Sequence, residues 1–158
     1  MRQRAWWLAL AAVLAGCSGP AKQEPAPVKR IVPTAIKVSD ESRRFPSKDQ
    51  VKIELVEQKL LGKDFLPGGN LAEYKRRGKT YQQFLIRAQS PDKAAFLLLD
   101  FKNILADAKF VPHMGAFYGR DGDLPVYVLQ KGVWLAGYVG LTDREAEPLA
   151  REFAARLN

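Results

Sequence analysis

The feature that most restricts how this chain can fold is a pair of two-residue turn signals, each set between short apolar runs. Arg77-Gly78 separates residues 71–76 from residues 79–88, and Lys131-Gly132 separates residues 125–130 from residues 133–140. A link of two residues joins antiparallel neighbours, because parallel strands need a crossover connection of a dozen or more residues. The sequence therefore predicts two β-hairpins and a sheet that is mostly antiparallel.

Apolar residues alternate between two faces along these runs. In the first hairpin Phe84 and Ile86 face one way, and Tyr81 and Leu85 face the other. Residues 125–130 are apolar on both faces, with Val126 and Val128 opposite Tyr127 and Leu129, which predicts a central strand. Two further strands are expected at 51–55 and 116–119, and two turns at Pro67-Gly68-Gly69-Asn70 and Asp121-Gly122.

Two segments place apolar residues at helical spacing. The first begins at Ser90-Pro91, where Ser90 suits the N-cap and Pro91 the first helical position. Its stripe consists of Ala94, Leu97, Leu98, Phe101, Ile104, Leu105 and Ala108. Phe96 and Leu99 lie on the other side of this helix, either under a second layer or as an exposed apolar patch.

The second helical segment lies at the end of the chain. Thr142 and Glu145 have the spacing of a capping box, and the stripe that follows consists of Ala146, Leu149, Ala150, Phe153 and Leu157. Pro148 removes a backbone hydrogen bond inside a helix, so the regular helix is expected to begin near this residue.

The elements follow the order βββαβββα. This order predicts one α+β domain at 49–158, in which about six mostly antiparallel strands are covered by two amphipathic helices. Residues 18–33 hold four prolines among small and charged residues, so 17–48 are expected to form a disordered, extended tether.

Residues 1–16 have the order of a secretory signal peptide. Arg2 and Arg4 precede an apolar run at 5–15, which small residues close. These 11 apolar residues fall short of the roughly 20 that a membrane-spanning helix needs. Export is therefore the favoured interpretation.

The signal ends in Leu14-Ala15-Gly16-Cys17, which resembles the lipobox of bacterial lipoproteins. The resemblance implies that the Cys17 thiol carries diacylglycerol, and with it palmitate-like acyl chains, and that Cys17 is the mature N-terminus. Two or three acyl chains anchor a protein stably in a membrane. Ser18 resembles the residue that directs such proteins to the outer membrane, facing the periplasm.

The remainder of the chain resembles exported bacterial domains of unassigned function in two stretches. Residues 81–94 run from a strand into a Ser-Pro-capped helix, and residues 123–132 end a strand at a Lys-Gly turn. This resemblance implies the fold and carries no catalytic residue.

Composition limits the chemistry of the mature protein. Cleavage after residue 16 leaves 142 of 158 residues and removes two of the 25 basic ones, so the mature chain has 23 basic and 17 acidic residues, a net charge of +6. In the envelope such a charge favours lipid headgroups, lipopolysaccharide phosphates or acidic polymers as neighbours, and not nucleic acid. Cys17 is the only cysteine, so the domain has no disulfide, thiolate metal site or cysteine nucleophile.

The densest basic cluster is Lys75-Arg76-Arg77-Gly78-Lys79, flanked by Tyr74 and Tyr81. At a hairpin tip the side chains of Lys75, Arg76, Arg77 and Lys79 would bind phosphates or carboxylates. The alternative is a solvated turn that keeps a sheet edge from aggregating.

No set of residues in the sequence marks a catalytic or metal site. His113 is the only histidine, and Asp121-Gly122-Asp123 lacks the further acids of a calcium loop. We therefore expect no cofactor beyond the lipid, and a non-enzymatic, membrane-anchored periplasmic domain that binds an envelope protein or an anionic polymer. The alternative is an envelope hydrolase or small-ligand-binding protein built on Asp100, Asp121, Asp123 and His113, which a deep pocket would favour.

Overall fold

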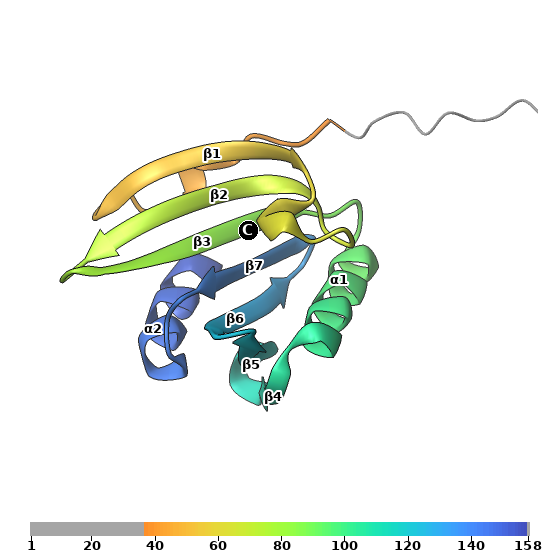
Figure 1. Ribbon diagram of the computed structural model, residues 1–158. Helices are drawn as coiled ribbons and strands as arrows, with labels where there is room; N and C mark the ends of the chain where they lie inside the picture. The colour runs from red at the N-terminus through yellow and green to blue at the C-terminus, as the bar shows by residue number, and fades with distance from the viewer. Residues whose placement is uncertain (1–36, 158) are drawn as a thin grey trace, which may run out of the picture. The chain divides into compact units, whose positions relative to one another are not determined.

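A computed structural model describes residues 37–157 of the chain. Within these residues the chain forms seven strands and two α-helices, joined by turns and three short 3-10 helices, η1 to η3 (Figure 1). The elements are β1 (Gln50–Gln58), β2 (Pro67–Arg76), β3 (Lys79–Arg87), α1 (Pro91–Ile104), β4 (Ala106–Val111), β5 (Ala116–Asp121), β6 (Leu124–Lys131), β7 (Trp134–Val139) and α2 (Asp143–Ala154). The predicted α+β class is confirmed.

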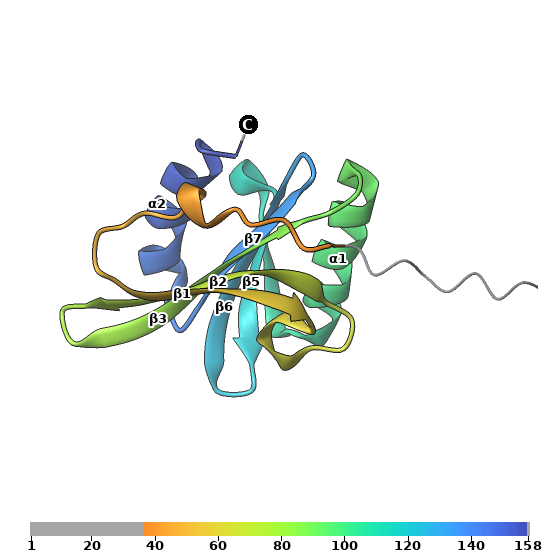
Figure 2. The ribbon, with the colours of Figure 1, turned by 90° about the horizontal axis from the view of Figure 1, so that it is seen from above.

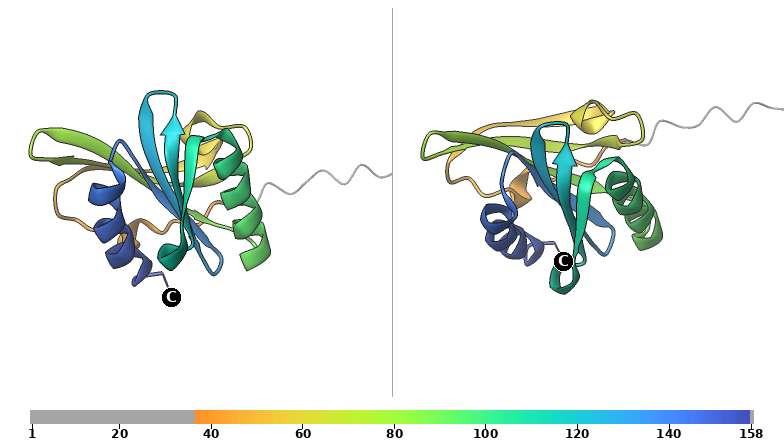
Figure 3. Two further views of the ribbon diagram at one scale, coloured as in Figure 1. Left: turned by 90° about the horizontal axis from the view of Figure 1, so that it is seen from below. Right: turned by 60° about the horizontal axis from the view of Figure 1, so that its bottom comes forward.

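All strands belong to one open antiparallel sheet with the order β1-β2-β3-β7-β6-β5-β4. Helix α1 carries the chain from β3 to the far edge at β4, and three hairpins then return it to β7 beside β3. The sheet twists strongly, so that β1 to β3 cross the direction of β5 and β6 in Figure 2. The two helices lie on opposite sides of the strands (Figure 3).

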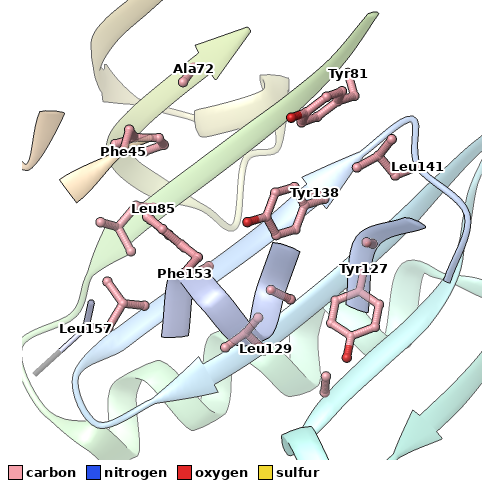
Figure 4. Close-up of a cluster of buried hydrophobic side chains, with 14 of the residues drawn as sticks. Phe45, Ala72, Tyr81, Leu85, Tyr127, Leu129, Tyr138, Leu141, Phe153 and Leu157 are labelled. Carbon is pink, nitrogen blue, oxygen red and sulfur yellow. The ribbon is translucent and has the colours of Figure 1, made fainter. Parts of the chain in front are cut away.

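The two faces of the sheet bury different aromatic residues. All five tyrosines of the chain pack on the face covered by α2, together with Phe45 and Phe153. Figure 4 shows three of them, Tyr81, Tyr138 and Tyr127, along that face. The face covered by α1 buries Phe84, Phe101, Val126, Val128 and Ile86 instead. The predicted assignment of alternating residues to two faces is thus confirmed in β3 and β6.

The stretch Pro67-Gly68-Gly69-Asn70 is not a turn, as its composition predicted, but the first part of β2. Gly69 pairs with Val56, and a Cβ atom at Gly69 would lie 2.6 Å from the Leu85 carbonyl oxygen. Glycine is therefore required here by the close approach of a neighbouring backbone. The connection before β2 instead contains η2 (Leu60–Gly62), whose Leu60 is buried on the α1 face.

A seventh strand replaces the last part of the predicted first helix. Helix α1 begins at the predicted cap, where the Lys93 amide donates to the Ser90 hydroxyl at 3.2 Å, but it ends at Ile104. Ala108, which the apolar stripe assigned to the helix, lies in the edge strand β4 and still packs against the α1-face core. Ala108 contacts the same core as the apolar residues of α1, so the spacing of apolar residues did not show where the helix ends.

Helix α2 begins at Asp143, and not near Pro148 as predicted. The Thr142 amide donates to Glu145 Oε2 at 2.9 Å, which confirms the predicted pairing of these residues. This cap fixes the first turn, and Pro148 lies inside the helix. The expected stripe is also confirmed, because Ala146, Ala150 and Phe153 are buried.

The segment before β1 packs on the domain. Phe45, in the stretch that the sequence analysis assigns to the tether, is buried with its ring centroid 5.4 Å from that of Phe153. Asn70 accepts a hydrogen bond from the Glu41 amide at 3.1 Å and donates one to the Ser39 carbonyl at 2.9 Å. These contacts hold residues 39–45 against the α2 face.

The buried position of Phe84 leads to a stability prediction. Phe84 is 0% exposed and stacks on Phe101, whereas Phe96 on the outer side of α1 is 59% exposed. Phe84→Ala should therefore lower the free energy of unfolding by about 3–5 kcal/mol. The matched variant Phe96→Ala should change it by less than about 0.5 kcal/mol. Urea denaturation of both variants tests this, and equal losses would contradict the assignment of the core.

Candidate binding surface at the hairpin tip

The β2–β3 hairpin confirms the predicted two-residue turn. Arg76 pairs with Lys79, and the two residues between them have positive φ angles, 51° at Arg77 and 79° at Gly78. Positive φ at both central positions defines a type I′ turn, which matches the twist of the flanking strands. The side chains of residues 75–80 are exposed, and the tip extends away from the rest of the domain in Figures 1 and 2.

The four cations of the tip have different surroundings. The Lys79 ammonium lies 2.7 Å from Glu145 Oε2, and Arg76 Nε lies 3.8 Å from Asp49 Oδ2. Lys75 and Arg77 form no ion pair within residues 37–157. The basic cluster is therefore divided, because Lys79 is engaged by α2 whereas Lys75 and Arg77 present their charges to solvent.

Glu145 links the hairpin to the beginning of α2. Its carboxylate accepts hydrogen bonds from the Lys79 ammonium at 2.7 Å, from the Thr142 amide at 2.9 Å and from the Thr142 hydroxyl at 2.7 Å. Lys79 first, and Thr142 next, lower the pKa of Glu145 from 4.5 to about 2. The same carboxylate thus caps the helix and holds the hairpin in place.

The flanking tyrosines do not reach the tip surface. Tyr74 and Tyr81 stack with ring centroids 5.1 Å apart and are buried on the α2 face. The Tyr74 hydroxyl donates to the Pro46 carbonyl at 2.8 Å. The exposed surface of the tip therefore presents guanidinium and ammonium groups and neither of the two tyrosine rings. Such groups bind phosphate and carboxylate oxygens.

The structure does not bring together the four residues considered for an enzyme or a small-ligand site. Asp121 pairs with Lys63 at 2.6 Å and lines a recess of about 270 Å³ on the α1 face. His113 lies beside α2, with Nε2 2.9 Å from Glu147 Oε1, and Asp100 and Asp123 are exposed. The other residues that line the recess are Leu61, Leu71, Gln82, Phe101, Leu124, Val126 and Val139.

The polar residues that line this recess are Asp121 and Gln82, and neither is a buried group without a hydrogen-bond partner. The buried side-chain atoms without a hydrogen-bond partner in the described part of the chain are Gln83 Nε2 and the Tyr127 hydroxyl. The alternation of β3 and β6 places both residues on the opposite face, under α2. Among residues 37–157, no three His, Cys, Asp or Glu side chains are grouped so that they could hold a metal ion.

Phe96 and Leu99 form part of the exposed surface of α1, 59% and 48% exposed. Within residues 37–157 no second layer covers them, which favours the exposed patch of the two alternatives that the sequence left. Neither helix in residues 37–157 is long and apolar enough to cross a bilayer. The predicted lipidation site, Cys17, lies outside the described residues.

No protein-family model, curated protein or solved structure matches this chain.

The lowered pKa of Glu145 leads to a prediction about pH. A carboxylate whose pKa is lower in the folded than in the unfolded state adds stability above the unfolded pKa, and this stability is lost as pH falls through the folded pKa. Glu145→Gln should therefore lower the melting temperature at pH 7, and the difference from wild type should shrink between pH 4.5 and about 2. The matched variant Glu152→Gln removes a carboxylate of the same helix that, within residues 37–157, forms an ion pair with Arg156 alone. A difference for Glu145→Gln that stays constant across this pH range would contradict the role of its carboxylate.

Proposed function

We propose that the protein is a bacterial envelope lipoprotein whose folded domain is a non-enzymatic binding module. The proposal for the anchor rests on the order of the first 17 residues, a basic start, a short apolar run and the lipobox-like Leu14-Ala15-Gly16-Cys17. Ser18 favours the outer membrane, with the domain facing the periplasm. The prolines of residues 18–33 suit a spacer between the membrane and the domain.

The proposed contact surface is the hairpin tip, and its ligand is an anionic envelope polymer with phosphate or carboxylate groups. The observation that carries this proposal is the exposure of Lys75 and Arg77 at the end of a projecting hairpin, with no carboxylate paired to either in residues 37–157. Guanidinium and ammonium groups without a paired carboxylate can bind phosphate or carboxylate oxygens without first giving up an existing ion pair. Arg76 lies between them in the sequence and is exposed, but its Nε lies 3.8 Å from Asp49 Oδ2, so it is partly engaged by a carboxylate.

The recess on the α1 face supports a second candidate function, the binding of a small apolar ligand. Its lining is mostly aliphatic and aromatic, with Asp121 and Gln82 as polar groups. At about 270 Å³ it lies slightly below the size of common ligand sites. Asp121 is already paired with Lys63, so it is a weaker candidate than the tip cations for binding a new partner.

The anchor proposal predicts the outcome of a lipid-labelling experiment. Cys17→Ser removes the only thiol of the chain, so incorporation of labelled palmitate should fall to background. Ser18→Ala changes the next residue and leaves the thiol in place, so this matched variant should stay labelled. Labelled Cys17→Ser protein would show that the lipid, if any, is attached elsewhere.

The tip proposal predicts a loss of binding to anionic material. In a Cys17→Ser background, Lys75→Gln, Arg76→Gln and Arg77→Gln together should weaken co-sedimentation with purified cell-wall polymer at least tenfold. The reason is that each basic residue contributes about 1 kcal/mol to binding an anionic surface. The effect should diminish as salt is raised, because exposed charges are screened.

A matched control removes the same charge elsewhere. Lys93, Lys102 and Lys109 are exposed on α1 and β4, away from the hairpin, and their replacement by Gln should reduce binding much less. Equal losses in the two triple variants would indicate a response to net charge alone. Vesicles with anionic lipids, tested in parallel, separate a polymer ligand from the membrane surface.

A further inference from the structure

The two edge strands of the sheet differ in how they are protected from pairing with another chain. β4 is six residues long, and its pairing with β5 is interrupted between Ala106 and Lys109, where Asp107 has a φ of 54°. Short length, bulges and lysines are common means of keeping a sheet edge unpaired. β1 is nine residues long, and its register shift lies at its start, between Gln50 and Lys52. From Lys52 onward, β1 is a regular edge with no strand on its outer side in the described part of the chain.

The side chains of β1 would face complementary side chains if a second β1 strand paired with it in the antiparallel direction. Val51 and Leu55 are large apolar residues that are 60% and 46% exposed. Between them lie Lys52 and Glu54, which pair with each other at 2.5 Å and have side chains that are 62% and 41% exposed. Val51 lies at the register shift between Gln50 and Lys52, so the regular part of the strand reads, around Ile53, cation, Ile53, anion.

We propose that β1 pairs antiparallel with β1 of a second copy of this chain, with Ile53 opposite Ile53 of that copy. In this register Lys52 lies opposite Glu54 of the second copy. This charged contact occurs twice, because a two-fold axis makes both partners use the same surface. Opposite charges and apolar pairs that face each other across antiparallel strands stabilise a sheet.

The neighbouring registers are less favourable. Directly opposed residues of antiparallel strands lie on the same face, so a continuous sheet permits only shifts that keep the two faces aligned. The next such register in one direction places Lys52 opposite Lys52 of the copy, and the next in the other direction places Glu54 opposite Glu54. Both oppose like charges, which destabilises the pairing.

The faces of the sheet also match in the proposed register. Ile53 and Leu55 pair with Ala72 and Asn70 of β2, so they lie on the face covered by α2. Lys52 and Glu54 lie on the other face, opposite Glu73 and Leu71. The Ile53 pair would therefore extend the α2-face core, and the charged pairs would remain on the other face of the strand edge.

The test uses full-length chains that carry two different epitope tags and are expressed together. After detergent extraction, purification through one tag reports how much of the other chain is bound. Wild-type copies should co-purify. Lys52→Glu in both copies, or Glu54→Lys in both copies, should reduce recovery at least tenfold, because each change places like charges opposite each other twice.

Two combinations should restore the pairing. A Lys52→Glu chain with a Glu54→Lys chain opposes unlike charges again, and so does the double variant K52E/E54K with itself. The control Arg156→Glu breaks the exposed ion pair between Arg156 and Glu152 at the C-terminal end of α2 and should not change recovery. Failure of wild-type copies to co-purify, full recovery of either single variant with itself, or no restoration in the mixture would overturn the proposal.

Discussion

The pairing of β3 with β7 is the contact on which the rest of the domain depends. β3 belongs to the first part of the domain, β1 to β3, and β7 belongs to the second part, β4 to β7; along the chain the two parts are connected by α1. In the register of β3 and β7, Phe84 lies opposite Gly137. A Cβ atom at Gly137 would lie 2.6 Å from the Phe84 ring, so the ring occupies the space that a side chain would need. The same ring stacks on Phe101 of α1 at a centroid distance of 5.5 Å. One aromatic residue thus joins the two parts of the sheet and the helix that connects them.

The hairpin tip depends on the opposite face of the sheet. Tyr74 and Tyr81 stack there at the level where the hairpin leaves the core, and Tyr81 also contacts Tyr138. Beyond them, Glu145 binds Lys79 and caps α2 at the same time. The hairpin and the start of α2 are therefore linked through one carboxylate. A tip held in this way would lose little backbone freedom on binding the anionic polymer proposed above.

Short sequence patterns correctly predicted the turns and helix caps that are formed by residues close together in the sequence. The Arg77-Gly78 turn, the Ser90 cap and the Thr142–Glu145 pair each involve residues within a few positions of one another, and all three were predicted. β4 and the start of β2 could not be assigned in this way. Ala108 is buried on the α1 face whether it belongs to a helix or to a strand, and Gly69 is explained only by its distance to Leu85 in another strand.

The same limit applies to the candidate site. The sequence identified the basic residues at the tip, but it could not show that Lys79 is engaged by Glu145, because these residues lie 66 positions apart. Lys79 is paired with Glu145, whereas Lys75 and Arg77 are exposed and have no ion pair within residues 37–157, so the four predicted contact residues differ in their surroundings. The complementary pattern of β1 was present in the sequence, yet it gained meaning only when the strand order placed β1 at an edge.

The tip and the β1 edge meet at Asp49, which directly precedes β1. Its carbonyl oxygen accepts a hydrogen bond from the Lys75 amide at 2.9 Å, and its carboxylate lies 3.8 Å from Arg76. In the proposed dimer the two β1 strands run in opposite directions, so the two basic tips would lie at opposite ends of the shared sheet. Two tips at opposite ends of the shared sheet cannot bind the same anionic group. They would instead join two separate sites on a polymer, where the second contact is strengthened by the first because it forms within the same complex.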